Sequence, residues 1–259
     1  MRNKLNNIAQ YALTFDVDWA PDYAIDFVTQ YLIEKKVKST WFITHLSPAI
    51  ERLKLYPELF ELGLHPNFLP NSSHGKTEEE VMATLLDMVK GAKVLRAHCL
   101  VQSSRLLGMM VRKFGIEVDC SLFLPKSSNI EPHIINYDEN VALVRIPYFW
   151  EDDEECYDPK QSWDFQHSKY HVSGLKIFNF HPTYIYLNCS DMKGYEEVKQ
   201  FGYLADIEEE TIQKYINPNN GVRNIFEGYV DFISKGKQIQ MNMTEISKEY
   251  LKYEYFNFK

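Results

Sequence analysis

The chain has 259 residues, of which 45% are hydrophobic and 14% aromatic, and this is enough to bury the core of a single domain over residues 1–259. The formal net charge is −8 and no run of Lys and Arg is long enough to follow a phosphate backbone, so we expect no nucleic-acid partner. The first ten residues lack the apolar segment of a secretory signal, and no stretch approaches the roughly 18 apolar residues that span a bilayer, so we expect a cytoplasmic protein without membrane insertion.

Short β-rich runs alternate with helical patterns along the chain. Residues 77–90 open with Thr77 and Glu80 at capping-box spacing, and a second helical pattern over 103–114 is followed by Gly115. Repeated strand and helix implies parallel strands joined by crossovers. We therefore expect an α/β fold, a distorted (β/α) barrel of seven to eight mostly parallel strands, with an open doubly wound sheet as the alternative. The predicted strands are 11–16, 39–44, 61–65, 94–98, 116–121, 142–148, 175–181 and 239–243, and the acidic run EDDEE at 151–155 is expected to be a loop.

Polar residues stand at the carboxyl ends of five of these strands. In a β/α barrel those ends converge on one face, so residues far apart in sequence would form one cluster. Asp16 in particular lies between Phe15 and Val17, where a buried aspartate needs strong partners or a metal. The strand-end residues are Asp16 and Asp18, His65, Arg96 and His98, Tyr148, and His181.

The run TFDVD at 14–18 resembles the first motif of the polysaccharide deacetylase family, the NodB-homology proteins of carbohydrate esterase family four, which commonly reads TFDD. Four further stretches resemble the remaining motifs of that family in the same order, over roughly residues 10–190. They are ELGLHPNFLPNSSHG, LRAHC, IPYFWEDD and IFNFHPTY. Among the branches of the family, the sequence is most similar in character to the WbmS-like branch associated with O-antigen gene clusters.

The resemblance implies a role for each matching residue. Asp18, His65 and His74 would be metal ligands, and Asp16 would be the catalytic base. A second set would support the chemistry around them: Arg96, Asp152 and His181. The implied activity is a metal-dependent hydrolase that removes an N-acetyl group from an amino sugar or glycan precursor. Zinc is the expected ion, with nickel, cobalt or iron as alternatives.

The second and fourth motifs depart from the family pattern. His65 and His74 are nine residues apart with two prolines between them, so they cannot share a helical turn as the usual pair does. His98 is the replacement candidate if His74 is not the third ligand. In the fourth motif the Trp precedes the acids, which leaves Asp152 and Asp153 as interchangeable candidates for the partner of His181.

The chemistry requires these residue types independently of the family. Two imidazoles and one carboxylate leave a metal site with an open position, where water becomes more acidic. Asp16 can accept a proton beside that site, Arg96 would keep it ionised, and His181 can protonate the departing amine. Two other hypotheses stay open: an amidohydrolase acting on a small non-sugar amide or cyclic imide, and an inactive carbohydrate-binding relative. The sequence indicates no oligomeric state.

Overall fold

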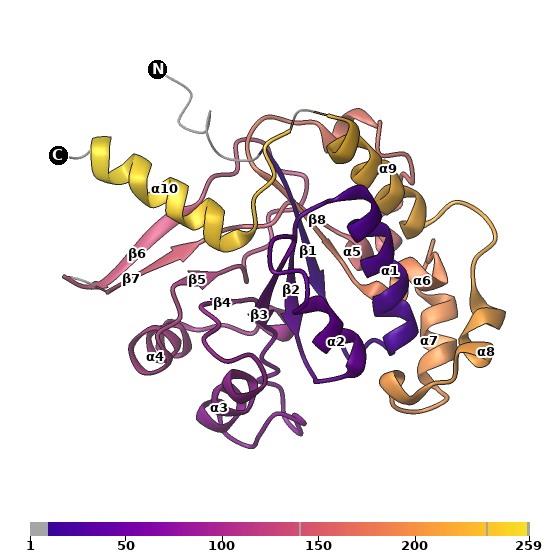
Figure 1. The fold of residues 1–259 in the computed structure, drawn as a ribbon, viewed down its shortest axis with the longest axis horizontal. Coiled ribbons are helices and arrows are strands. Elements are labelled where there is room, and N and C mark those ends of the chain that lie inside the picture. Colours follow the sequence, from indigo (N-terminus) through magenta and orange to yellow (C-terminus); the bar gives the residue numbers. More distant parts are fainter. Residues whose placement is uncertain (1–9, 140, 237, 258–259) are drawn as a thin grey trace.

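One mixed sheet of nine strands forms the centre of the molecule (Figure 1). The computed structural model describes residues 10–139, 141–236 and 238–257. Along the sheet the strands follow the order β6-β7-β5-β4-β3-β2-β1-β9-β8, and every neighbouring pair is parallel except β6 with β7. This mostly parallel, curled sheet with helices around it confirms the predicted barrel-related class. The strands are β1 Tyr11–Asp16, β2 Ser39–Ile43, β3 Phe60–Leu64, β4 Val94–Leu95, β5 Val118–Asp119, β6 His133–Asp138, β7 Val141–Arg145, β8 Trp150–Glu151 and β9 Lys176–Phe180.

Most of the helices pack on the convex side of the sheet, whereas the last helix lies against its other side (Figure 1). Helix α1 contacts α2, α6 and α9, and α10 contacts β5. The helices are α1 Asp22–Lys35, α2 Pro48–Leu53, α3 Glu78–Met88, α4 Ser104–Phe114, α5 Asp152–Tyr157, α6 Pro182–Leu187, α7 Lys193–Lys199, α8 Glu209–Ile212, α9 Val222–Lys235 and α10 Met243–Asn257.

The alternation of side chains along each strand produces two separate cores. Leu13 and Phe15 of β1 join the larger core beneath the convex-side helices. Ala12 of the same strand belongs to a smaller core with Ile177 of β9, and Ile246 of α10 closes it. Because successive strand residues point to opposite faces, Thr14 and Asp16 must lie on the same face as Ala12.

The starts of both predicted helices and the end of the second are confirmed, whereas the first helix ends at Met88, before the predicted residue 90. The Thr77 side chain accepts from the backbone of Glu80, and the Glu80 carboxylate accepts from the backbone of Thr77, which is the expected capping box of α3. Ser103 caps α4, and Gly115 ends it in the left-handed conformation (φ 64°) that glycine adopts without steric cost.

Two other predictions about local structure are wrong. Residues 152–155 of the EDDEE run are not loop, because Asp152 begins α5, where acidic first-turn residues are favoured by the helix dipole. Residues 239–242 form no strand, and Met243 begins α10. Asn242 and Glu245 exchange hydrogen bonds of 2.9 Å between side chain and backbone in a capping box. Strands β6 and β8 were not predicted.

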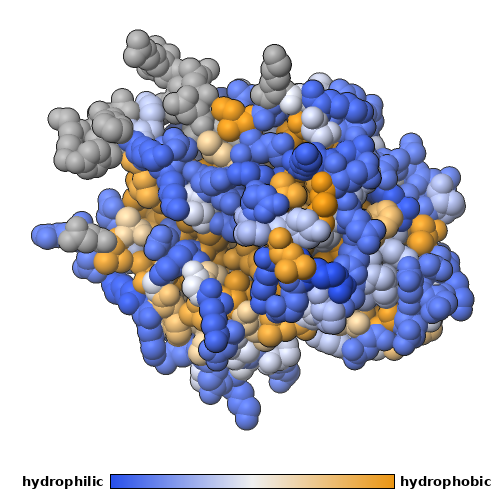
Figure 2. All heavy atoms as spheres, in the orientation of Figure 1, coloured by the Kyte–Doolittle hydropathy of each residue, from blue (hydrophilic) through white to orange (hydrophobic). Residues whose placement is uncertain are grey.

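The face of the molecule shown in Figure 2 is covered mainly by hydrophilic residues, with hydrophobic patches scattered between them. Within the described residues, no helix combines the length and the apolar character needed to cross a membrane.

Candidate active site

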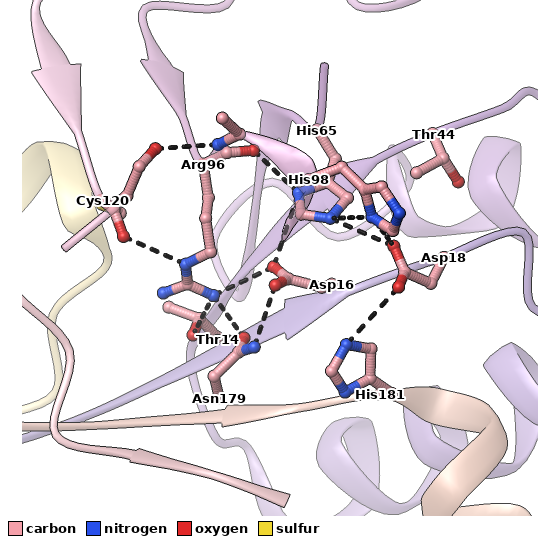
Figure 3. A network of polar contacts seen from close by, with 12 residues as sticks. Thr14, Asp16, Asp18, Thr44, His65, Arg96, His98, Cys120, Asn179 and His181 are labelled. Carbon is pink, nitrogen blue, oxygen red and sulfur yellow. Dashed lines mark hydrogen bonds and ion pairs between the residues drawn. The ribbon is translucent and has the colours of Figure 1, made fainter. Parts of the chain in front are cut away.

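Polar side chains gather where the strands end at their carboxyl side (Figure 3). The register of the sheet explains this, because Thr14 is paired with Asn179 and Leu64 with Leu95. His65 and Arg96 therefore follow β3 and β4 at the same level across the sheet. Strand ends of five different segments thus bring their polar residues together, as the sequence led us to expect.

Arg96 occupies the centre of this cluster and is fully buried. Its guanidinium lies between the rings of Phe42 and Tyr148, with the guanidinium carbon 4.5 Å and 4.4 Å from the two ring centroids. Nη1 donates to Oδ1 of Asp16 at 2.9 Å and to Oδ1 of Asn179. Aromatic faces and a carboxylate thus hold the buried charge in one orientation.

Asp16 is held at both of its oxygens. Oδ1 accepts from Arg96 and Oδ2 accepts from Nδ2 of Asn179 at 2.9 Å. Burial by itself would raise the pKa of Asp16, but the attraction of Arg96, together with that of His65 and His181, outweighs burial, and the pKa lies below its ordinary value. Asp16 is therefore an ionised, oriented carboxylate with 3% of its surface exposed.

Asp18, His65 and His98 form a compact group beside Asp16. Their ligand atoms lie within 4.8 Å of one another. Oδ1 of Asp18 is 3.1 Å from Nε2 of His65 and 3.0 Å from Nδ1 of His98, and the two imidazole nitrogens are 3.3 Å apart. Asp18 lies in the loop after β1, His65 directly follows β3, and His98 begins the short 3₁₀ turn His98–Leu100.

The backbone that presents this group is strained. Asp18 and Trp19 have φ of 45° and 54°, and Cys99 and Leu100, which follow His98, have φ of 51° and 53°. Consecutive non-glycine residues in the left-handed region are costly and persist only where the surroundings impose them. The strain thus lies at Asp18 itself and in the residues that directly follow Asp18 and His98.

The donor atoms of Asp18, His65 and His98 fit a divalent metal ion. His65 donates from Nδ1 to the carbonyl oxygen of Arg96 at 2.7 Å, which leaves Nε2 unprotonated and facing Asp18. A backbone acceptor that fixes the tautomer in this way is the usual support of a metal-binding histidine. One carboxylate and two imidazoles suit zinc, and three protein ligands leave a position for water or substrate.

The structure places His74 away from this group, which differs from the predicted ligand set. Both ring nitrogens of His74 are engaged with backbone: Nε2 donates to the carbonyl oxygen of Thr44 at 2.7 Å, and Nδ1 accepts from the amide of Asn67 at 3.2 Å. No nitrogen lone pair is free for a metal. The third position beside Asp18 and His65 is taken by His98, the alternative that the sequence left open.

His181 follows β9 and is paired with Asp152. Nδ1 of His181 is 2.6 Å from Oδ1 of Asp152, and the backbone amide of His181 donates to Oδ2 of the same carboxylate at 2.7 Å. Burial would lower the pKa of His181, but the fully buried Asp152 carboxylate raises it well above its ordinary value. Asp152, and not Asp153, makes this contact. Nε2 of His181 lies 3.6 Å from Oδ2 of Asp18, on the side opposite His65.

Sequence reasoning missed Asn179 and Glu151. Oδ1 of Asn179 accepts from Thr14 and Arg96, and Nδ2 donates to Asp16 and Glu151. Both polar atoms of the amide are therefore hydrogen-bonded. Glu151 also accepts from the hydroxyl of Tyr148 at 3.0 Å, and burial raises its pKa well above the ordinary value. Asn179 precedes His181 by two residues and so shares its face of β9, and this spacing was the signal available in the sequence.

A family model described as WbmS-like polysaccharide deacetylase matches residues 13–199, which include the whole cluster. The chain belongs to this family. The deacetylase resemblance stated from the sequence is confirmed. No curated protein matches the chain significantly.

Solved structures resemble this chain to different degrees. WbmS of Bordetella bronchiseptica, described as a polysaccharide deacetylase involved in O-antigen biosynthesis, is 29% identical over 85% of this chain and 89% of that chain, with a TM-score of 0.73. The peptidoglycan deacetylase PdaC of Bacillus subtilis is 12% identical over 97% and 96% of the two chains, with a TM-score of 0.47. A CE4-family pseudoenzyme of Bacillus anthracis is 12% identical over 95% of this chain and 67% of that chain, also with a TM-score of 0.47.

Proposed function

We propose that this chain is a metal-dependent deacetylase that removes an N-acetyl group from an amino sugar or glycan precursor. The observation that carries the proposal is the convergence of three ligand atoms between an oriented carboxylate and a paired imidazole. Asp16 flanks the group of Asp18, His65 and His98, and His181 lies across from His65.

Asp18, His65 and His98 would hold one divalent ion, zinc by the chemistry of the donor set, with nickel, cobalt or iron as alternatives. A bound ion would act as a Lewis acid toward an amide carbonyl and would make water more acidic. The fixed Nδ1–H of His65 keeps its other nitrogen available for this role.

Asp16 would accept the proton of the attacking water. Its carboxylate is ionised because Arg96 lowers its pKa, and Arg96 and Asn179 fix the direction of its two oxygens. A base that is already oriented needs no reorganisation at the moment of proton transfer.

His181 would donate the proton that the departing amine needs. The Asp152 carboxylate accepts from Nδ1 and keeps the imidazole protonated, so Nε2 carries the transferable proton. Base and acid thus have opposite protonation states at neutral pH because each has a partner of opposite charge.

The amide substrate is expected to be an N-acetylated sugar. Two observations support this choice: the matching family is described as polysaccharide deacetylase, and the similar WbmS is described as acting in O-antigen biosynthesis. A glycan precursor is the form that an enzyme of glycan biosynthesis would meet.

The test is to incubate metal-loaded protein with N-acetylated mono-, oligo- and nucleotide-sugars and to measure acetate and new primary amine together. Equal release of both from at least one sugar is the expected result. Hydrolysis of a cyclic imide or small amide but of no sugar would replace the proposal with the amidohydrolase hypothesis. Tight sugar binding without hydrolysis would identify an inactive carbohydrate-binding relative.

A further inference from the structure

Four rings lie in a row beside the ligand group, and only two of them belong to it. His74 is stacked on Trp19, with ring centroids 5.5 Å apart and planes inclined by 29°. Trp19 in turn stands nearly perpendicular to His98, at 5.4 Å and 81°. His98 meets His65 in the same way, at 5.3 Å and 83°. Trp19 is therefore the link between a histidine that binds no metal and the histidine proposed as third ligand.

Thr44, which follows β2, binds the first two members of this row, His74 and Trp19. Its carbonyl oxygen accepts from Nε2 of His74 at 2.7 Å, and its hydroxyl accepts from the backbone amide of Trp19 at 3.0 Å. His74 is almost fully buried, with 3% of its surface exposed, so the ring on which Trp19 stacks is held in place by its surroundings. The indole of Trp19 rests on a ring that is itself held by two backbone groups.

His98 needs such a support more than His65 does. The His65 ring is fixed by the 2.7 Å bond from its Nδ1 to the Arg96 carbonyl and is 2% exposed. The side chain of His98 is 18% exposed, and within the described residues its ring makes polar contacts to Asp18 and His65 through Nδ1. In the described structure Trp19 is thus the ring that packs on His98 from outside the ligand group.

We propose that Trp19 and His74 are positioning residues for His98, so that its Nδ1 faces Asp18 and Nε2 of His65. The inference rests on the proposed function, because it requires that Asp18, His65 and His98 hold an ion. It also explains the departure of the second motif: its second histidine acts through Trp19 on the ligand group instead of joining it. Supporting residues of this kind typically contribute about 10- to 100-fold to metal affinity.

The experiment uses cobalt(II) as the probe, with full-length protein freed of metal by chelator. Dissociation constants are measured by chelator competition, and the visible ligand-field absorption of bound cobalt reports ligand geometry independently of activity. Trp19→Leu and His74→Phe are expected to weaken cobalt binding by about 10- to 100-fold and to alter the spectrum, whereas Trp19→Phe, which keeps a ring, should lose less than about 10-fold. Trp163→Leu and His167→Phe are the matched controls and should leave both readouts unchanged, since in the described structure neither ring contacts Trp19, His74 or the ligand group.

Wild-type affinity and spectrum in a folded Trp19→Leu protein would overturn the inference. If circular dichroism shows that Trp19→Leu does not fold, His74→Phe decides in its place, because it keeps a ring against Trp19 and removes the bonds to Thr44 and Asn67. Failure of the proposed function is recognised separately: wild-type protein would then bind no cobalt, or Asp18→Ala would bind it as wild type does.

Discussion

The two ends of the concave face of the sheet differ in chemistry although the same strands build both. Near the strand starts, Ala12, Val94 and Ile177 belong to the same buried apolar cluster as Ile246 of α10. A few residues further along, the same faces of β1, β4 and β9 carry the polar residues of the site. Those residues are Thr14 and Asp16, Arg96, and Asn179 and His181.

This difference shows how one strand serves stability and chemistry together. The period of two keeps Ala12, Thr14 and Asp16 on one face, and only the distance along the strand decides which of them meets α10. Buried charge at the carboxyl ends is tolerated because each group has a partner: Arg96 with Asp16 and His181 with Asp152. The apolar end should therefore control folding, and the polar end metal binding and catalysis.

Loss of a ligand should have the largest effect. Asp18→Ala or His65→Ala is expected to abolish bound metal, because removal of either leaves two protein donors in place of three. The measurement is metal content per chain after dialysis, with Ile246→Ala at the apolar end as the control that keeps its ion. Full occupancy in both ligand variants would locate the metal elsewhere.

Removal of the base or the acid should be next in size. Asp16→Asn and His181→Ala are expected to keep the ion and to lower kcat by about 10²- to 10⁴-fold, the usual contribution of general acid–base catalysis. Steady-state acetate release is compared with metal content in the same preparations. A drop of less than about tenfold in either variant would remove that residue from the role assigned to it.

The fold class and the location of the site were predictable from sequence because both depend on patterns that the chain repeats. The β-rich runs at 11–16 and 175–181 predicted two central strands, and their polar ends predicted the cluster. The region 239–242 was misassigned because its β-forming residues outweighed the Asn242 to Glu245 capping signal. The EDDEE run was misassigned because its charge suggested solvent, whereas the acids of α5 have partners of opposite charge and backbone donors.

The proposed ligand set was predictable only in part. Asp18 and His65 are fixed by strand ends, but the position of His74 depends on how a nine-residue spacing folds, which no periodicity predicts. The contacts of His74 with Thr44 and Asn67 are tertiary and leave no trace in the local sequence. Asp152 could be distinguished from Asp153 only once the start of α5 was known.

Weakening the apolar end should reduce stability alone. Ile246 is fully buried in the smaller core, and Ile246→Ala is expected to lower the free energy of unfolding by about 2–5 kcal/mol. Denaturant unfolding measures this, with the 40% exposed Leu251 changed to Ala as the matched control. If folded Ile246→Ala lost its metal as well, the two ends would not be independent.

The smallest expected effect is a shift in pH dependence. His181 must be protonated to act, so the rate should fall as pH rises through its raised pKa. Asp152→Asn removes the charge that raises this pKa, and the alkaline limb of the kcat profile should move about 1–3 pH units lower. The profile is measured at saturating substrate and metal. An alkaline limb that stays in place would mean that another group is the acid.

The central claim is that one ion held by Asp18, His65 and His98 works with Asp16 in amide hydrolysis. Metal content and acetate release, measured on the same preparations of wild-type, His98→Ala and Asp16→Asn protein with an N-acetylated sugar, test it most directly. The account predicts one ion and acetate release for wild type, neither for His98→Ala, and one ion without appreciable acetate release for Asp16→Asn. Undiminished metal content and acetate release in His98→Ala would contradict it.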